Sequence, residues 1–248
     1  MSELHPATRG FAAADVYERG RPDYPRAAIE RIVERLDLRP GRTVLDLAAG
    51  TGKLTRLLVP SGANLIAVEP LREMRAELER RVPGVLVLAG AAERIPLTDG
   101  FVDAVTVASA FHWFDADAAL REIWRVLVPG GGLALIWNAR DERSDLQREL
   151  SELIGPLRGD TPSRTLRDWR ALLADSAMFE RSERLLFEHE QLVDEDGLVA
   201  RVLSVSFVGA LPVADRRVIE ERVRALARDA ERPIRLSYMT ELYLGFAS

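Results

Sequence analysis

Four small or acidic residues alternate along one short stretch of the chain: Asp46, Ala48, Gly50 and Gly52. The stretch follows an apolar run and precedes a helical pattern, so it predicts a loop between a buried strand and a helix. Small residues let a ligand approach the backbone, and the first amides of a helix can donate hydrogen bonds to it. Asp46 could hold this loop or receive an ammonium group of the ligand. A tight turn without a ligand is the alternative interpretation.

An acidic residue, Glu69, follows Gly50 by 19 positions and ends the next apolar run. A carboxylate there can accept hydrogen bonds from the two vicinal hydroxyls of a ribose, which predicts a site for a nucleoside-containing ligand. Alternatively, Glu69 caps the helix that begins at Pro70.

The loop differs from two common nucleotide-binding patterns. The dinucleotide fingerprint has three glycines, but Ala48 stands at the first of these positions and Lys53 at the third. A phosphate-binding P-loop requires a longer spacing and a terminal Gly-Lys-Ser/Thr, which is also missing. What remains is Asp-x-Ala-x-Gly-x-Gly.

His112 lies in the aromatic segment Phe111-His112-Trp113-Phe114, directly after the fourth apolar run. Ligands of open α/β sheets bind beyond the carboxyl ends of the strands, where this segment begins. His112 could act as a general base, shape a pocket or donate a hydrogen bond to a substrate, or serve only the structure. The aromatic neighbours could be pocket wall or core.

Short apolar runs and helical patterns alternate through the first half of the chain, which predicts a parallel sheet with helical crossovers. The five runs are Thr43–Leu47, Leu65–Glu69, Val85–Ala89, Val102–Ala108 and Leu133–Trp137. We expect Pro129–Gly132 to end a helix and to turn the chain into the fifth strand. In the second half we expect helices over 145–157, 166–174, 196–210 and 214–230, and strands over 185–193 and 235–243.

Composition excludes several classes of function. The chain has 248 residues, a net charge of -5 and no cysteine, and its three histidines form no metal-binding motif. We therefore expect no metal and no nucleic-acid partner. No apolar run approaches the roughly 20 residues of a membrane helix, and the first residues do not resemble a signal peptide, so we expect a cytoplasmic protein without a membrane partner.

Five motifs in order give the chain a specific resemblance. They are Val44–Thr55, Val68–Pro70, Gly90–Leu97, Ala110–Phe114 and Glu122–Gly131, together with the N-terminal Tyr17–Pro25. The set resembles the class I S-adenosylmethionine-dependent methyltransferases, in particular the methyltransferase type 11 or trans-aconitate methyltransferase-like branch. The resemblance implies one doubly wound, Rossmann-like α/β domain, with a seven-stranded, mostly parallel sheet, an antiparallel last strand and a helical cap.

The resemblance also implies a set of cofactor-binding residues. Ala48, Gly50 and Gly52 would line the methionine part of S-adenosylmethionine, and Glu69 would bind the ribose. Many relatives have an aspartate at the position of Ala91, so the polar contact to adenine is altered here. Ala48 replaces a glycine, which is a mild change if its φ is negative. The full predicted set is Asp46, Ala48, Gly50, Gly52, Glu69, Pro70, Met74 (or Leu71), Ala92, Glu93 and Ser109.

For the methyl acceptor the resemblance implies a small molecule, methylated at oxygen, nitrogen or carbon. His112 is the candidate catalytic residue, and the candidate binding residues are Tyr17, Phe111, Trp113, Trp137 and Arg140. Arg140 could pair with a carboxylate of the acceptor or cap a surface loop. We expect a lid over 1–37, a cofactor-binding core over 38–137, a cap insertion over 138–180, and the remaining sheet and helices over 181–248.

Two rival functions remain open at this point. One is a cofactor-binding sensor or partner subunit without transfer activity, and the other is an NAD-dependent oxidoreductase, which the missing third glycine disfavours. The expected assembly is a monomer or a homodimer.

Overall fold

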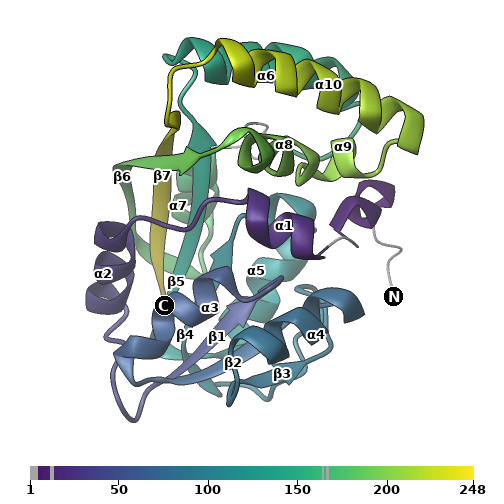
Figure 1. Cartoon of the computed structure of the whole chain (residues 1–248). Coiled ribbons are helices and arrows are strands. Elements are labelled where there is room, and N and C mark those ends of the chain that lie inside the picture. Colours follow the sequence, from purple (N-terminus) through teal and green to yellow (C-terminus); the bar gives the residue numbers. More distant parts are fainter. Residues whose placement is uncertain (1–4, 12–13, 164, 166–167) are drawn as a thin grey trace. The chain divides into compact units, whose positions relative to one another are not determined.

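A computed structural model describes residues 5–11, 14–163, 165 and 168–248 of the chain (Figure 1). Its contacts divide the chain into two compact units. The sheet unit comprises Asp23–Asn138, Pro162–Phe187 and Thr240–Ser248, and the helical unit comprises Met1–Pro22, Ala139–Thr161 and Glu188–Met239. The predicted cap insertion over 138–180 is thus divided between the units.

Seven strands form one sheet in the order β3-β2-β1-β4-β5-β7-β6. The neighbours among β1 to β5 pair in parallel, and the last strands are antiparallel, which confirms the predicted fold class. The strands are β1 (Thr43–Leu47), β2 (Asn64–Val68), β3 (Leu86–Leu88), β4 (Val102–Ala108), β5 (Leu127–Arg140), β6 (Phe179–Val193) and β7 (Ile234–Ala247).

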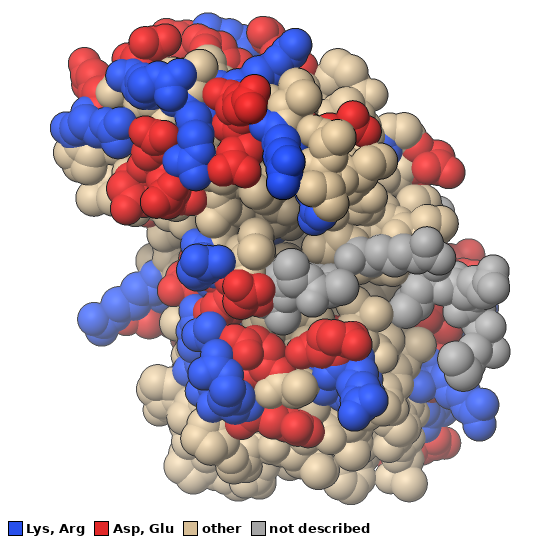
Figure 2. All heavy atoms as spheres, turned by 45° about the vertical axis from the view of Figure 1, so that its right-hand side comes forward, with Lys and Arg blue, Asp and Glu red and all other residues tan. Residues whose placement is uncertain are grey.

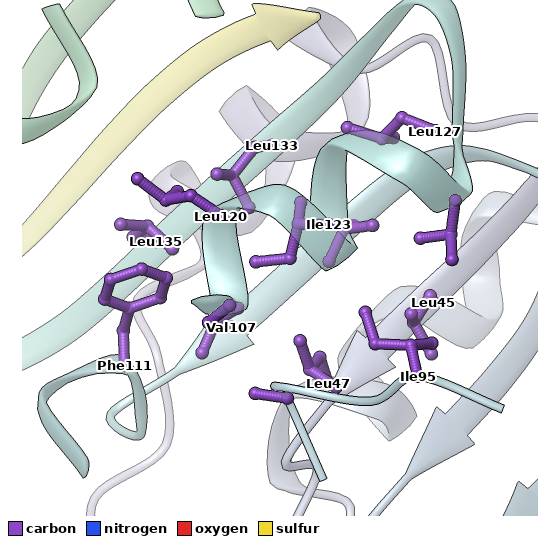
Figure 3. Packing of buried hydrophobic residues seen from close by; sticks show 14 of the residues in the cluster. Leu45, Leu47, Ile95, Val107, Phe111, Leu120, Ile123, Leu127, Leu133 and Leu135 are labelled. Carbon is purple, nitrogen blue, oxygen red and sulfur yellow. The ribbon is translucent and has the colours of Figure 1, made fainter. Parts of the chain in front are cut away.

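Helices cover both faces of the sheet because the strands are apolar on both sides. Leu45 and Val105 face one apolar cluster with α5 and α7, whereas Val44 and Ala104 face another with α2 and α3. Figure 3 shows the first cluster, in which Leu120 and Ile123 of α5 lie over Leu133 and Leu135. The helices of this unit are α2 (Arg26–Arg35), α3 (Lys53–Leu58), α4 (Arg72–Arg81), α5 (Ala116–Val126) and α7 (Trp169–Asp175).

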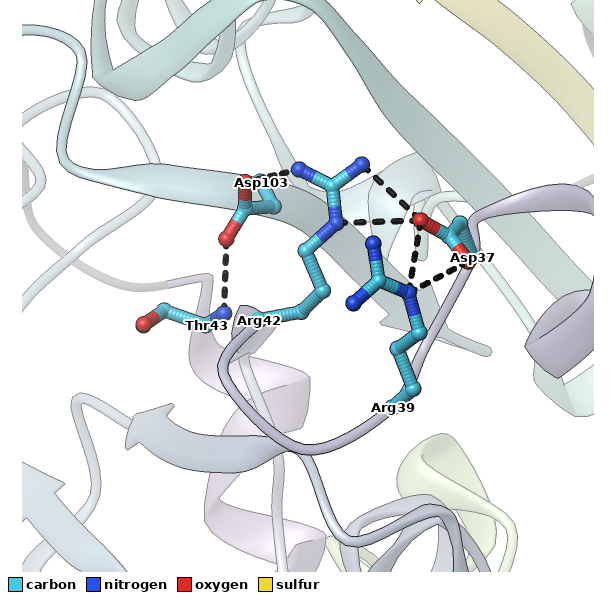
Figure 4. A network of polar contacts seen from close by, with 5 residues as sticks. All are labelled: Asp37, Arg39, Arg42, Thr43 and Asp103. Atoms are coloured by element: carbon cyan, nitrogen blue, oxygen red, sulfur yellow. Dashed lines mark hydrogen bonds and ion pairs between the residues drawn. The ribbon is translucent and has the colours of Figure 1, made fainter.

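A polar network fixes the amino ends of β1 and β4 (Figure 4). Asp103 accepts hydrogen bonds from the amide of Thr43 at 2.7 Å and from Arg42 at 2.6 Å. Arg42 also donates to Asp37, which accepts from Arg39 as well. The two central strands are therefore held together at the end opposite to the loop after β1.

The helical unit has its own apolar core. Leu150, Leu198 and Val223 are fully or almost fully buried in it and come from three different helices. The helices are α1 (Ala14–Gly20), α6 (Asp145–Ile154), α8 (Glu195–Leu203), α9 (Ser206–Gly209) and α10 (Val213–Asp229). Helix α1 packs along α8.

Several predicted boundaries are wrong, among them the start of β6, which begins at Phe179 rather than at residue 185. Pro129–Gly132 does not end a helix but lies inside β5. Leu127 of β5 pairs with Val102 of β4, and Gly132 pairs with Ala104, so five steps along β5 match two steps along β4. A bulge therefore absorbs these residues. The predicted helix over 196–210 is broken into α8 and α9. Part of the predicted helix over 166–174 lies outside the described residues, and α7 forms the rest.

The surface shows no extended area of one charge on the face drawn in Figure 2, where arginines alternate with acidic side chains. None of the described helices has both the length and the apolar composition needed to cross a membrane.

Candidate functional site

The carboxylate of Glu69 lies buried at the end of β2 and holds the loop that follows β1. Its Oε2 accepts from the amide of Gly50 and its Oε1 from the amide of Leu71, each at 2.9 Å. Burial raises the pKa of Glu69 to about 7, although these two amides and the nearby Arg75 oppose the rise. A carboxylate has about four acceptor positions, so two remain for further donors such as hydroxyl groups.

Gly50 presents open space to a ligand. It adopts φ +57°, and a Cβ atom added to it would meet no atom within 4 Å. The backbone here can therefore be approached closely, as a cofactor cradle requires. Gly50 and Glu69 together fit the predicted site for a nucleoside cofactor.

Both carboxylate oxygens of Asp46 accept hydrogen bonds from other side chains of the protein. Its Oδ2 accepts from the hydroxyl of Thr55 on α3 at 2.5 Å, and its Oδ1 from Thr106 on β4 at 3.2 Å. Burial raises the pKa of Asp46 to about 6, against the effect of both hydroxyls. These contacts favour the first alternative for Asp46, in which it holds the loop.

Two non-glycine residues adopt left-handed backbone conformations just beyond adjacent strands. Ala48 follows β1 with φ +54°, and Ser109 follows β4 with φ +55°. The φ of Ala48 is therefore positive, so the condition under which alanine would be a mild replacement for glycine is not met, and the residue carries backbone strain. Such strain is concentrated at functional sites in proteins, because the surrounding structure must enforce it.

Gly52 has a different role from the one expected. A Cβ atom there would lie 2.9 Å from Leu78 and 3.0 Å from Val82, both of which are buried in the apolar cluster under α4. The missing side chain of Gly52 therefore makes room for protein packing rather than for a ligand, and its φ of +83° adds a second requirement for glycine.

The predicted adenine-side residues lie in the segments that follow β2 and β3. Met74 is buried on α4, and the carbonyl of Pro70 accepts from Arg75 at 2.8 Å. Ala92 is buried in a turn after β3. Glu93 accepts from the amide of Asp115 at the start of α5, so its carboxylate already has one partner within the protein.

His112 is joined to an aromatic cluster. Its Nδ1 lies 3.3 Å from the indole Nε1 of Trp137, and its ring lies beside Trp113. Trp137 is 2% exposed and stacks on Trp169, with ring centroids 5.3 Å apart. Tyr243 contacts Trp137 edge-on. Phe111 is fully buried, so the less buried members of the segment are His112, Trp113 and Phe114.

The sequence does not predict the aromatic cluster as a unit. Trp169 and Tyr243 join it only through tertiary contacts. The hydroxyl of Tyr24, a residue of the predicted lid over 1–37, lies 2.9 Å from that of Ser109. The neighbouring Asp23 pairs with Arg56 and with Lys53, the one lysine in the chain.

Two predicted acceptor-binding residues, Tyr17 and Arg140, belong to the helical unit. Arg21 lies over the ring of Tyr17 at 5.2 Å from its centroid. Arg140 is half-buried, and its Nη1 lies 3.4 Å from the hydroxyl of Ser151. The other predicted site residues lie in the sheet unit.

Comparisons with known proteins agree with this geometry. A family model described as a methyltransferase domain matches residues 45–135. The uncharacterized methyltransferase Rv3342 of Mycobacterium tuberculosis is 42% identical over 215 residues, which cover 87% of this chain and 84% of that protein. The uncharacterized methyltransferase-like protein C25B8.10 of Schizosaccharomyces pombe is 33% identical, with 90% of each chain covered.

Among solved structures, a candidate type II methyltransferase from Anaeromyxobacter dehalogenans has the same fold. The TM-score is 0.65 at 24% identity, with 91% of this chain and 97% of that chain covered. Fold, motif order and the strand-end site agree with the relationship in sequence. The chain is therefore a member of the class I S-adenosylmethionine-dependent methyltransferases.

Proposed function

We propose that this chain binds S-adenosylmethionine at the carboxyl ends of β1 and β2 and transfers its methyl group to a small-molecule acceptor. The observation that carries the proposal is the buried Glu69 carboxylate, fixed by the amides of Gly50 and Leu71 beside the open backbone of Gly50. Glu69 would bind the two ribose hydroxyls, and Ala48 to Gly50 would border the methionine part. Met74, Ala92 and Glu93 would border the adenine.

When bound, S-adenosylmethionine supplies an electrophilic methyl group on a sulfonium, which is a strong built-in leaving group. The residues of the chain therefore mainly have to align the acceptor and exclude water. We assign His112 to the acceptor side as a hydrogen-bond donor, because its Nδ1 already faces the indole N–H of Trp137. Trp137 would position His112 rather than contact the acceptor, since its side chain is 2% exposed.

We further propose that the two units act as one methyltransferase domain. The relatives align over 87–90% of the chain, and so over residues of both units. Tyr17, Phe111, Trp113 and Arg140 stay candidates for acceptor binding, and Phe111 would contribute only through the core.

Thermal unfolding with added ligands tests the cofactor assignment. S-adenosylmethionine and S-adenosylhomocysteine should each raise the melting temperature, because ligand at about 100 times its Kd stabilises the native state by roughly 2.7 kcal/mol. NAD should have no effect. A shift with NAD alone would support an oxidoreductase and contradict the proposal.

Turnover tests the enzymatic part separately. The purified chain is incubated with S-adenosylmethionine and a metabolite library, and release of S-adenosylhomocysteine is measured. An acceptor-dependent release is expected. Tight cofactor binding without release for any acceptor would instead favour a sensor or partner subunit.

A further inference from the structure

One side chain of α4, that of Arg75, spans the turn that leads from Glu69 into this helix. Its Nη1 donates to the carbonyl of Glu69 and to the carbonyl of Pro70, each at 2.8 Å. A terminal guanidinium nitrogen carries two hydrogens, so both of them are used on these adjacent carbonyls. Arg75 is half-buried in the first turn of α4. The guanidinium group is therefore fixed against the backbone of the turn.

The turn between β2 and α4 is thereby held from two sides. On one side, the carboxylate of Glu69 accepts a hydrogen bond from the amide of Leu71 at 2.9 Å. On the other side, Arg75 holds the two carbonyls that precede the helix. Leu71 is the N-cap residue of α4, and a leucine side chain cannot cap a helix. Without Arg75 the backbone of Glu69 would lose this support, and its carboxylate could turn away from Gly50.

Arg75 also brings a positive charge close to the buried carboxylate. Its Nη1 is bonded to the backbone of Glu69 itself, so only a few covalent bonds separate that carbonyl from the carboxylate. Burial raises the pKa of Glu69 and the negative charge of Asp46 on β1 adds to the rise, whereas the charge of Arg75 lowers this pKa. Arg75 thus favours the ionised form, which is the stronger hydrogen-bond acceptor.

We propose that Arg75 is a positioning residue of the cofactor site, which holds the Glu69 carboxylate in the place and the charge state that binding of the two ribose hydroxyls requires. This role rests on the proposed function, because the ribose is the group assigned to Glu69 there. Arg75 would act through Glu69 rather than on the cofactor itself, since Nη1 is committed to the two carbonyls. Its hydrogen bonds and its charge would make separate contributions.

Three substitutions separate the hydrogen bonds of Arg75 from its charge. Arg75→Lys keeps the charge, Arg75→Gln keeps two N–H groups without the charge, and Arg75→Met removes both. Calorimetry measures the binding of S-adenosylhomocysteine to each variant. Arg75→Met should bind roughly tenfold more weakly even where Glu69 is fully ionised, which corresponds to the loss of one or two hydrogen bonds. The matched control, Arg72→Met, removes an exposed arginine from the same turn of α4 and should bind like the unaltered chain.

The pH dependence of binding gives a readout that a purely structural role would not change. In the unaltered chain the affinity should fall below about pH 7, where Glu69 takes up a proton. In Arg75→Gln the midpoint of this fall should move to a higher pH, because the neighbouring positive charge is lost. In Arg75→Lys the midpoint should stay near pH 7. Weaker binding with an unchanged midpoint in Arg75→Gln would make Arg75 structural only and overturn the proposal.

A titration without ligand distinguishes failure of this inference from failure of the proposed function. The carboxyl carbon of Glu69, assigned by NMR through its loss in Glu69→Gln, should titrate at a higher pH in Arg75→Gln than in the unaltered chain or in Arg72→Met. Equal titration in all three proteins would overturn the role of Arg75, even if the cofactor binds. Absence of cofactor binding by the unaltered chain would contradict the proposed function instead. If Arg75→Met fails to fold, the glutamine and lysine variants still decide between these outcomes.

Discussion

Nδ1 of His112 accepts a hydrogen bond from the indole Nε1 of Trp137, at 3.3 Å. An indole N–H can only donate, so Nδ1 carries no hydrogen, and the neutral ring carries its hydrogen on Nε2. In this form His112 can donate through Nε2, but it has no free basic nitrogen. The hydrogen bond from Trp137 thus favours the role of His112 as a hydrogen-bond donor over its role as a general base.

Replacement of His112 by glutamine or by alanine should therefore have different effects. Glutamine can present an N–H group near the position of Nε2, so His112→Gln should retain more turnover than His112→Ala. If His112 acted as a general base, both variants would lose turnover equally. Steady-state kinetics with an identified acceptor measures the difference, and cofactor affinity should stay within about 1 kcal/mol in both variants.

Trp137→Phe should lower turnover while the aromatic stack with Trp169 is kept, because only the N–H that fixes the His112 ring is lost. The pH profile of kcat should change as well, since Nδ1 becomes able to take up a proton. If neither kcat nor its pH profile changes, the hydrogen bond has no role in the reaction.

Glu69→Ala should weaken binding of S-adenosylmethionine by about 1.5–3 kcal/mol, the scale of hydrogen bonds to a charged group. Asp103→Ala is the matched control. Asp103 also accepts a hydrogen bond from a backbone amide, but at the opposite ends of the strands. Its loss should therefore cost about 1–2 kcal/mol of stability and leave cofactor affinity unchanged. Calorimetry and urea unfolding of both variants separate the two effects.

Cofactor affinity and protein stability should depend on pH in opposite directions near Glu69. Its folded pKa is raised from 4.5 to about 7. Its contribution to stability is therefore fully present below pH 4.5 and is lost as the pH rises to about 7. Affinity should instead fall below pH 7, because the ionised carboxylate is the better acceptor for ribose hydroxyls. Glu69→Gln should remove both trends, and equal slopes in the two proteins would contradict the assignment.

Gly50 and Gly52 should respond differently to substitution. Gly52→Val places a side chain against Leu78 and Val82 at a positive φ, so it should cost more than about 2 kcal/mol of stability. The Cβ atom added in Gly50→Ala would meet open space, so the only cost to stability is the backbone strain of a positive φ. This variant should remain folded and lose cofactor affinity. Urea unfolding with calorimetry checks both. A stable Gly52→Val that fails to bind would restore the ligand-facing role expected from the sequence.

Ala48→Gly should stabilise the protein by about 1 kcal/mol, because glycine adopts the observed φ of +54° without strain. Ala49→Gly next to it should destabilise instead, since Ala49 is not among the residues with positive φ. Equal losses in the two variants would show that the alanine at 48 is not strained.

The sequence predicted the strands best where they are buried on both faces. Thr43–Leu47 and Val102–Ala108 are found at the expected bounds, because continuous apolar runs have few other structures open to them. The start of β5 was missed, since a bulge that accommodates Pro129–Gly132 depends on pairing with a distant strand. Local turn residues could not reveal that pairing.

The candidate site shows the same division between local and tertiary information. Spacing was enough to select Gly50 and Glu69, which the structure joins by a hydrogen bond. The orientation of Gly52 toward α4, and the stack of Trp169 on Trp137, depend on how separate elements pack.

The left-handed Ala48 also bears on how this sequence evolves. A glycine at this position would relieve strain, yet the chain carries alanine, so selection has not required the stability that the exchange would provide. Natural proteins are commonly only a little more stable than their function requires, so stabilising substitutions such as Ala48→Gly are still available to them. Replacement of Ala48 by glycine could thus compensate for destabilising changes in the proposed acceptor-binding segments, and new specificities could arise without loss of the fold.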